Sequence, residues 1–505
     1  MFNPPINPSE KEFADFAAAA RLPVTPLIFK AANDGMQAWT AFAALEKNRP
    51  LAFLLESADP GENGRYSFMG VAPRRVFRFA EGVFSTCNGA GEVLETQRCA
   101  DPIAALEKRM DGLRVPVAAG ELPPFLGGVA GYAGYDCVHC FEPVGDKKPD
   151  LLGVPEMLWM QTDLLAVFDR FRRAVYVIKS CCAEDGKNWR AVYRRGRKEA
   201  ESLLAEMSSA PRPSLRLPPR APRRPLKIKS NMTKTEFCAV VKAFKKHIRA
   251  GDIFQGVPSQ RLSFPRPAPA LDIYRCLRRT NPSPYMFYLK CGGFVAAGSS
   301  PELMISCRGG RIALRPIAGT RPRGASPEKD AALEKELLAN EKEIAEHLML
   351  VDLGRNDVGR VAAAGSVRVA DFCAVERYSH VMHIVSAVEG VLRPQQSAFS
   401  ALRAAFPAGT LSGAPKVRAM QLINEYEPCR RNIYGGCAGY AGFDGGLMTC
   451  IAIRAFTEKD GMCHVQAGGG VVADSDPAAE YAESMQKAAA VLQAAEMAGE
   501  EQEAA

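Results

Sequence analysis

The chain has 505 residues, of which 47% are hydrophobic and 24% are charged, and its 64 lysines and arginines exceed its 56 aspartates and glutamates by 8. This composition excludes a protein that is disordered throughout, and the length predicts roughly three units of about 150 residues. The first residues lack a secretory signal and no apolar run is long enough to span a membrane, so we expect a cytoplasmic protein without a membrane partner. Fifteen cysteines, an odd number scattered along the chain, indicate reduced thiols rather than a disulfide framework.

A Gly-rich segment of the first part of the chain occurs again near the end. Residues 127–136 (GGVAGYAGYD) and residues 435–444 (GGCAGYAGFD) are identical at eight of ten positions. Alternating glycines and aromatic residues are typical of strands whose backbones approach closely. The wide separation of the two copies predicts two similar sheets that arose by duplication. A chance likeness between Gly-rich segments is the alternative.

The other strand candidates set the fold class. Residues 164–178 and 447–456 have strand character and lie among helical segments without a regular alternation of strand and helix. This pattern predicts an α+β fold, with antiparallel sheets packed with helices and two similar sheet halves, rather than a doubly wound parallel sheet.

A proline-rich segment divides the chain. Residues 210–229 contain six prolines, seven cations and no acid, which predicts a semi-extended connector and leaves the remainder with 57 cations against 56 acids. We therefore expect an N-terminal part at 1–207, a connector at 208–230, a second domain at 231–495 and a frayed acidic tail at 496–505. A nucleic-acid-binding module is the alternative from another class, but no aromatic residue interleaves the connector's cations, so we expect no nucleic-acid partner.

Helix signals follow the connector. Thr233 and Glu236 form a capping box, and apolar residues at helical spacing continue until Gly251. Residues 327–353, rich in Glu, Lys, Leu and Ala, predict one long helix, on which Glu343 and Glu346 share a face.

A further helix is predicted near the C-terminus, with Asp476 as its cap and Pro477 as its first residue. Glu480, Glu483 and Lys487 would lie along one side of it. One carboxylate from each of the two acidic helices could hold Mg²⁺, which prefers oxygen ligands. On spacing alone, two solvated helix faces are the alternative.

Anion-binding and proton-transfer candidates flank this helix. The consecutive glycines 468–470 can turn backbone N–H groups toward a carboxylate. Arg454 alternates with apolar residues on a predicted strand and could meet the same anion, unless it is an ordinary edge-strand arginine. His380 and His383, three residues apart, could ligate a metal or transfer protons, although structural packing is equally compatible with them.

Several motifs, in order, are similar to those of one enzyme family. From about residue 237 to residue 492 the sequence resembles the chorismate-utilising enzymes, and among them the large subunits of anthranilate synthases. The motifs are 299–303 (SSPEL), 315–324 (RPIAGTRPRG), 346–357 (EHLMLVDLGRND), 406–416 (FPAGTLSGAPK) and the block 468–487. Looser matches at 54–57 (LLES) and 64–68 (GRYSF) extend the resemblance into the N-terminal part.

The resemblance implies an aromatic amination. In this family ammonia adds at C2 of chorismate, the C4 hydroxyl leaves, and pyruvate is eliminated to give anthranilate. It implies Glu346 and Glu483 as Mg²⁺ ligands, Glu302 as the acid that protonates the leaving hydroxyl, and His383 as an aid to pyruvate elimination. It also implies a set of chorismate contacts: Gly319, Thr320, Tyr434, Arg454, Gly468, Gly469, Gly470 and Lys487.

Two positions favour amination over related reactions. Aminodeoxychorismate synthases carry a nucleophilic lysine where this chain has Ala318, and isochorismate synthases carry a water-activating lysine where it has Gln255. Glutamine cannot deprotonate water but can hydrogen-bond ammonia, although it could also merely cap or pack. No glutamine amidotransferase segment is recognised, because the one Gly-x-Cys-x-Gly string, residues 435–439 (GGCAG), belongs to the Gly-rich repeat described above. We therefore expect a separate glutamine amidotransferase subunit and a hetero-oligomer.

The resemblance also implies feedback regulation by tryptophan. Residues 54–57 and 281–288 match the family's inhibitor site, which makes Ser57, Pro284, Tyr285 and Met286 the expected contacts. Two departures concern glycine: Gly354 replaces the family's usual alanine, and Gly469 stands where the family has Gly-Ala-Gly. Both remove a methyl group, which affects geometry rather than role.

Overall fold

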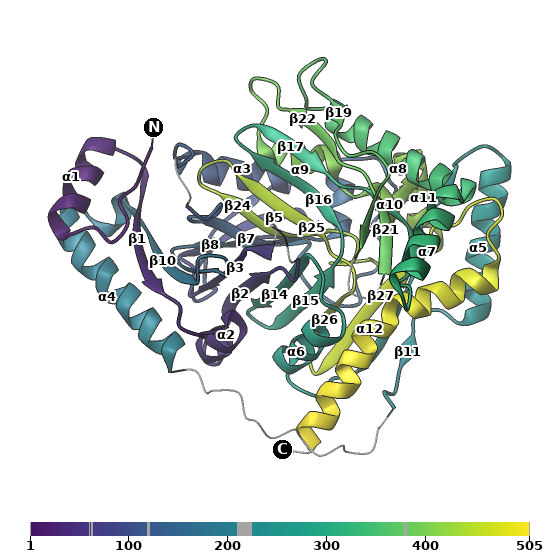
Figure 1. Ribbon diagram of the computed structural model, residues 1–505, viewed down its shortest axis with the longest axis horizontal. Coiled ribbons are helices and arrows are strands. Elements are labelled where there is room, and N and C mark those ends of the chain that lie inside the picture. Colours follow the sequence, from purple (N-terminus) through teal and green to yellow (C-terminus); the bar gives the residue numbers. More distant parts are fainter. Residues whose placement is uncertain are drawn as a thin grey trace.

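Figure 1 shows the computed structural model, which describes residues 2–59, 61, 64–118, 122–209, 225–377 and 381–503. Two large antiparallel sheets form its centre. The first sheet contains, in spatial order, β1 (Val24–Ala32), β10 (Ala174–Cys182), β9 (Leu164–Asp169), β3 (Tyr66–Val71), β2 (Leu51–Glu56), β14 (Tyr285–Cys291), β15 (Phe294–Ser300), β26 (Ala455–Lys459), β27 (Met462–Gly468), β13 (Ser259–Pro265) and β11 (Lys229–Ser230).

The second large sheet is also antiparallel. Its order is β19 (Arg368–Val369), β22 (Val388–Val391), β17 (Arg311–Leu314), β16 (Leu303–Arg308), β25 (Leu447–Ile451), β24 (Cys437–Gly442), β7 (Gly128–Ala133), β8 (Met157–Thr162), β4 (Arg75–Ala80), β5 (Val83–Asn88) and β6 (Val93–Arg98). Two small sheets accompany it: β12 (Gln255–Gly256) with β23 (Gly413–Ala414), and β18 (Ile317–Pro322), β21 (Val381–Val385) and β20 (Ala374–Arg377).

Helices cover the outer faces of both sheets (Figure 1). Buried side chains of α2, α4, α6 and α12 pack on the first sheet, and those of α3, α9 and α11 on the second. A third core, which includes Phe53 and Tyr132, lies between the sheets. The helices are α1 (Glu10–Ala20), α2 (Ala38–Glu46), α3 (Pro102–Asp111), α4 (Trp189–Ser208), α5 (Lys234–Arg249), α6 (Ala270–Thr280), α7 (Pro327–Ala339), α8 (Glu341–Gly359), α9 (Ala398–Ala405), α10 (Gly409–Ser412), α11 (Lys416–Tyr426) and α12 (Pro477–Glu503).

The two copies of the Gly-rich repeat are neighbours in one sheet. Both copies form strands, as predicted, and β7 and β24 pair directly with each other in one sheet. Gly131 lies opposite Gly439, and these glycines hold the same position in the repeat. A local two-fold axis therefore passes between them.

The first sheet has the same symmetry. At its centre β2 pairs with β14, with Leu54 opposite Tyr288. Outward from these central pairs, strands β3, β9, β10 and β1 are mirrored in order by β15, β26, β27 and β13, and strands β8, β4 and β5 by β25, β16 and β17. Each sheet thus consists of two similar halves, one from each part of the chain, as duplication predicts.

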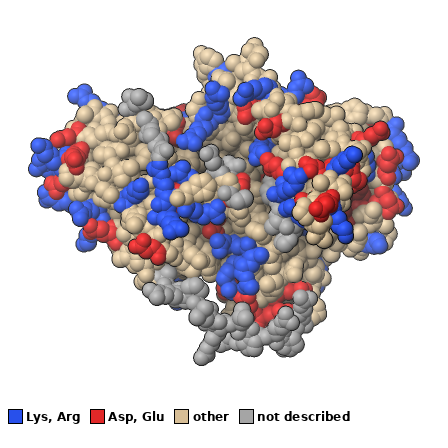
Figure 2. All heavy atoms as spheres, viewed as in Figure 1, with Lys and Arg blue, Asp and Glu red and all other residues tan. Residues whose placement is uncertain are grey.

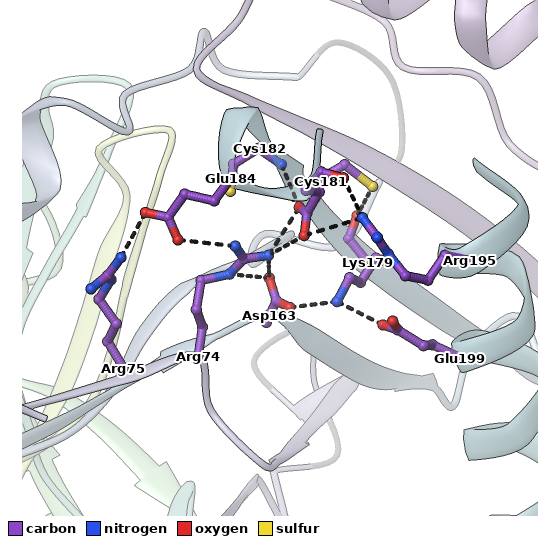
Figure 3. A network of polar contacts seen from close by, with 10 residues as sticks. Arg74, Arg75, Asp163, Lys179, Cys181, Cys182, Glu184, Arg195 and Glu199 are labelled. Carbon is purple, nitrogen blue, oxygen red and sulfur yellow. Dashed lines mark hydrogen bonds and ion pairs between the residues drawn. The ribbon is translucent and has the colours of Figure 1, made fainter. Parts of the chain in front are cut away.

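A network of ion pairs ties the first half together where β10 ends (Figure 3). Lys179 pairs with Asp163 at the crossing between the sheets and, at 2.7 Å, with Glu199 of α4. Arg74, just before β4, contacts Asp163 and Asp185, each at 2.9 Å. The whole network contains four cations and four carboxylates: Arg74, Arg75, Lys179 and Arg195 with Asp163, Glu184, Asp185 and Glu199.

The predicted helix caps were correct, whereas two predictions of helix extent were wrong. The capping boxes and caps of α5 and α12 were predicted correctly, since Thr233 accepts from the Glu236 N–H and Asp476 from the first turn of α12. The single long helix over 327–353 was wrong: it is α7 and α8, because the Asn340 side chain caps a new helix by accepting from Glu343 N. The frayed tail was also wrong over 496–503, which continues α12.

The connector and the surface charge bear on possible partners. Residues 210–224 of the connector lie outside the described residues, and the two large sheets draw strands from both sides of it. The domain boundaries stay a prediction.

Both signs of charge are interspersed over the face of the molecule shown in Figure 2. In the part of the chain that the structure describes, no helix is both long and apolar enough to cross a membrane.

The pairing of β7 with β8, next to the central pair of strands, leaves no room for a side chain at Gly131. A Cβ there would lie 2.1 Å from the Leu158 carbonyl oxygen and 2.7 Å from the Trp159 Cα, both backbone atoms. We expect Gly131→Ala to lower the free energy of unfolding by about 1–3 kcal/mol in urea denaturation followed by circular dichroism. Gly112→Ala is the matched control, since a Cβ there meets nothing within 4 Å. Equal stability of both variants would contradict the close approach.

Candidate active site

The predicted chorismate and metal residues gather in the second half of the chain. Glu302 directly precedes β16, Arg454 lies between β25 and β26, and Gly468 ends β27. The segment between β17 and α9 adds α8 with Glu346 and the β18–β21 pair with Thr320 and His383. These elements bring together residues that are almost two hundred positions apart in the sequence.

Glu302 is a buried carboxyl group. Its residue is 8% exposed, and its Oε1 accepts a hydrogen bond of 3.0 Å from the Thr410 hydroxyl. Burial raises the pKa of Glu302 to about 8, although the Thr410 hydrogen bond and the charge of Lys487 oppose this. A carboxyl group that keeps its proton at neutral pH can act as a general acid.

Gln255 faces the metal-ligand candidate Glu346. The Gln255 Nε2 donates to Glu346 Oε1 at 3.2 Å, while the Gln255 Oε1 is buried without a hydrogen-bond partner. β12 holds the glutamine backbone by pairing with β23, where Gly413 approaches so closely that a Cβ would lie 2.1 Å from the Gln255 carbonyl oxygen. The amide is thus fixed with one unused acceptor.

The two carboxylates predicted to bind Mg²⁺, Glu346 and Glu483, interact electrostatically. Burial raises the pKa of Glu346, and the charge of Glu483 contributes to this rise. Glu483 also pairs with Lys487 at 2.7 Å on α12. The structure adds Glu480, whose buried Oε2 has no hydrogen-bond partner and whose pKa is raised by burial. The sequence had placed Glu480 on the same side of this helix as Glu483, but the family resemblance gave it no role.

These residues fit a magnesium ion. Among the described residues, no three His, Cys, Asp or Glu side chains form a ready-made metal cage. Magnesium, however, usually takes one or two protein carboxylates and keeps waters and an anionic ligand. Glu346 and Glu483 supply such a pair, and the unpartnered oxygen of Glu480 is a further acceptor nearby, for the ion or for a water bound to it.

His383 lies against the predicted chorismate contacts of β18. Its Nδ1 is 3.0 Å from the Thr320 hydroxyl and 3.2 Å from the Gly319 carbonyl oxygen. Because a carbonyl only accepts, the bond to Gly319 requires the proton on Nδ1 and makes Nε2 the basic nitrogen. Burial lowers the pKa of His383, which keeps the ring neutral near pH 7. His380 lies outside the described residues.

Arg454 does not lie on a strand, contrary to the prediction. It joins β25 to β26 with φ +50°, a left-handed conformation that is uncommon for a non-glycine residue. Its Nη1 donates to the Lys487 carbonyl oxygen at 2.7 Å, which directs the guanidinium toward α12. Burial lowers the pKa of Arg454 and raises that of Tyr434 to about 12. The two side chains interact electrostatically, and the Tyr434 hydroxyl is bonded to the Gly468 backbone.

A side chain at any of the glycines 468–470 would crowd a neighbour, which is backbone at Gly468 and the end of a side chain at Gly469 and Gly470. A Cβ on Gly468 would lie 2.2 Å from the Pro258 carbonyl oxygen, and one on Gly470 would lie 2.5 Å from Gln255 Nε2. At Gly469, where the family has alanine, a Cβ would lie 2.7 Å from Glu480 Oε2. The second departure, Gly354, is equally crowded, since a Cβ would lie 2.6 Å from Leu314 Cδ1. Both departures therefore suit the local packing of this chain.

A separate cavity of about 290 Å³ lies between the ends of β2 and α2, close to the lower end of the size range of small-molecule sites. Ser57 and Met286, two predicted tryptophan contacts, line it; Pro284 and Tyr285 do not. Three charged side chains, which the sequence did not single out, also line it: Glu56, Arg170 and Arg278. Glu56 pairs with Arg278 at 2.8 Å and accepts from the Tyr274 hydroxyl.

Comparison with known proteins agrees with this arrangement. A family model described as chorismate binding enzyme matches residues 50–493. The chain belongs to the chorismate-binding enzymes. Within that family it is similar to anthranilate synthase component 1 of Pseudomonas aeruginosa, with 46% identity over 89% of this chain and 91% of the relative. The component 1 of Thermus thermophilus is 44% identical, over 91% and 95%.

Solved structures of chorismate-binding enzymes share the fold. Anthranilate synthase component I of Streptococcus pneumoniae superposes with a TM-score of 0.75 at 35% identity, covering 86% of this chain and 93% of that one. The isochorismate synthase MenF of Escherichia coli gives 0.66 at 17% identity, covering 96% and 100%, which shows the common fold alone. The α+β prediction with antiparallel sheets is thereby confirmed.

The raised pKa of Glu302 should appear in the pH dependence of stability. Between about pH 4.5 and about pH 8 the folded chain keeps the Glu302 proton and the unfolded chain releases it. Stability is therefore lost as pH rises through this window, by up to about 1.4 kcal/mol per pH unit. Because Glu302→Gln cannot ionise, its stability relative to the parent should increase with pH in urea denaturation.

The surface substitution Asp352→Asn is the matched control, since the Asp352 side chain is 80% exposed. A stability difference between Glu302→Gln and the parent that stays constant from about pH 5 to about pH 8 would show that Glu302 ionises normally.

Proposed function

We propose that this chain is the component 1 of an anthranilate synthase, a cytoplasmic lyase of tryptophan biosynthesis that converts chorismate and ammonia into anthranilate and pyruvate. The names of its relatives support the proposal. The observation that carries it is Gln255, whose Nε2 is engaged by Glu346 and whose buried Oε1 is left as an acceptor. This amide oxygen can accept an N–H of ammonia but cannot remove a proton from water.

Glu302 supplies the proton for the first step. Ammonia forms a bond to C2 of chorismate, the ring double bond shifts, and the C4 hydroxyl leaves as water with a proton from the Glu302 carboxyl. Thr410 donates to Oε1, which favours the acidic proton on Oε2. The raised pKa keeps that proton in place at neutral pH.

The carboxylates of α8 and α12 account for the proposed Mg²⁺. Glu346 and Glu483 would hold the ion, and the ion when bound supplies positive charge that neutralises the ring carboxylate of chorismate. Arg454 and Lys487 add two cations at the same place. The N–H groups of Gly468–Gly470 and the hydroxyl groups of Thr320 and Tyr434 complete the proposed substrate contacts.

His383 serves the second step. Pyruvate elimination requires removal of the proton on C2 and protonation of the departing enolpyruvyl group. A neutral imidazole with its proton on Nδ1 presents Nε2 as a base. The bonds to Thr320 and Gly319 fix the ring beside the proposed substrate contacts.

Two further parts of the proposal concern partner and regulation. A glutamine amidotransferase subunit would supply ammonia in a hetero-oligomer, as the component 1 names of the relatives suggest. Tryptophan would bind in the 290 Å³ cavity, where Glu56 can meet its ammonium group and Arg170 its carboxylate. Ser57 and Met286 line the same cavity.

The activity is tested directly. Purified chain with chorismate, Mg²⁺ and ammonium should release fluorescent anthranilate. 4-Amino-4-deoxychorismate, isochorismate or no product would refute the proposal. Glutamine should replace ammonium only after a glutamine amidotransferase subunit is added.

Gln255→Leu should impair the use of ammonia specifically. Loss of one neutral hydrogen bond costs about 1 kcal/mol, so we expect KM for ammonia to rise on the order of tenfold. Gln255→Glu, which keeps an acceptor, is the comparison variant. The KM for chorismate serves as the internal control, and an equal rise in both KM values would argue against an ammonia contact.

Removing a metal carboxylate should change the Mg²⁺ requirement. Glu346→Gln keeps the size of the side chain but loses its charge, so the Mg²⁺ concentration for half-maximal activity should rise at least tenfold. Glu389→Gln, on β22, is the matched control, since the Glu389 side chain is 34% exposed and pairs with Arg368 outside the proposed site. Unchanged metal dependence would remove Glu346 from the proposed ligands.

A further inference from the structure

We propose that Ser299 couples the tryptophan cavity to the chorismate site, an inference that rests on the proposed function of both. Ser299 is fully buried at the end of β15. Ser299 lies opposite Met286, which lines the tryptophan cavity. It also lies three residues before Glu302, the proposed acid of the chorismate site.

A continuous row of residues crosses the first sheet between the two sites. Glu56 of β2 is opposite Met286 of β14, and Met286 is opposite Ser299 of β15. Directly opposite residues of paired strands point to the same face of a sheet and are in contact. Both Glu56 and Met286 line the cavity, so Ser299 is the next residue in the row.

Ser299 makes one hydrogen bond toward each site. Its hydroxyl donates to the carbonyl oxygen of Asn281, the C-cap of α6 at the start of the 281–288 segment. Its backbone N–H donates to the Arg454 carbonyl oxygen at 3.1 Å. A shift of the 281–286 segment on tryptophan binding would therefore reach the backbone of Arg454 through a single residue.

Arg454 is sensitive to such a shift because of its conformation. Its φ of +50° is unfavourable for arginine and persists only when neighbouring bonds hold it. Two hydrogen bonds hold Arg454: the Ser299 N–H donates to its carbonyl oxygen, and its Nη1 donates to the Lys487 carbonyl oxygen of α12. When the first bond weakens, the guanidinium and the start of β26 can move, and the affinity for the chorismate carboxylate falls.

The energetic consequence is reciprocal. If tryptophan lowers chorismate affinity by some factor, chorismate must lower tryptophan affinity by the same factor. Typical coupling factors are about 5 to about 150. The hydrogen bond from the Ser299 hydroxyl to the Asn281 carbonyl connects Ser299 to the tryptophan cavity. Removing the hydroxyl should therefore reduce the coupling factor and leave both binding sites in place.

Ser299→Ala tests this link. Tryptophan affinity is measured by equilibrium dialysis with Mg²⁺ and without ammonia, in the absence and presence of saturating chorismate. In the parent, chorismate should weaken tryptophan binding at least fivefold. In Ser299→Ala the factor should fall to about 1–2, while tryptophan affinity alone stays within about threefold of the parent. The parent's coupling factor retained in this variant would overturn the proposal.

Ser300→Ala is the matched control. Ser300 is also fully buried, but its hydroxyl accepts from the Glu302 N–H at 3.3 Å and belongs to the chorismate side. The coupling factor of Ser300→Ala should remain that of the parent. If Ser300→Ala lost as much coupling as Ser299→Ala, any cavity at this strand end would uncouple the two sites, and the proposed role of the Ser299 hydroxyl would be overturned.

A second measurement needs no variant. Tryptophan binding to the parent should change amide hydrogen exchange in residues 299–302 and 454–456, and no change in either segment overturns the proposal. Failure of the proposed function is recognised separately, because the parent would then make no anthranilate or bind no tryptophan.

Discussion

Close pairing of two strands at the centre of each sheet is the constraint on which the rest of the structure depends. β7 pairs with β24, with Gly131 opposite Gly439, and a Cβ on either glycine would lie 2.1 Å from a backbone oxygen of the strand on its other side, β8 for Gly131 and β25 for Gly439. β2 meets β14 in the other sheet. These two pairings join the two parts of the chain into common sheets, and the strands counted outward from them position Glu302 before β16, Arg454 before β26 and Gly468 at the end of β27.

The two halves are alike in topology but not in electrostatics. Arg74 precedes β4 as Glu302 precedes β16, and α4 follows β10 as α12 follows β27. At this end of the first half, four cations and four carboxylates neutralise one another (Figure 3). In the second half, oxygens of Gln255 and Glu480 remain without partners. Only the second half contains the segment from β18 to β21, and this segment carries Glu346 and His383. The same framework thus holds a cluster of mutually paired charges in the first half and, in the second half, a site with unused acceptors for ligands.

Sequence patterns predicted what depends on local chemistry. The caps at Thr233 and Asp476 and the strands of the repeat follow from neighbouring residues, so they were correct. The motif resemblance correctly indicated the family and the fold. Properties that depend on distant contacts were not accessible. No pattern places the two repeats side by side, gives Arg454 a positive φ, or leaves Glu480 without a partner. The break at Asn340 had a local signal, because asparagine is a good helix cap, but it was masked by strong helix formers on both sides.

The charge of the site explains why the proposed metal and substrate need each other. Three carboxylates, Glu346, Glu480 and Glu483, outnumber Lys487 and Arg454, and the burial of Glu346 and Glu480 already raises their pKa values. A dicarboxylate substrate entering alone would meet further negative charge in a place of low dielectric, which is unfavourable. A divalent cation reverses the balance. The chain's surplus of 8 positive charges does not enter this balance, because seven of its cations belong to the sequence segment 210–229, which contains none of the site residues named above. Local placement of charge, not net charge, therefore determines which anion this fold can accept.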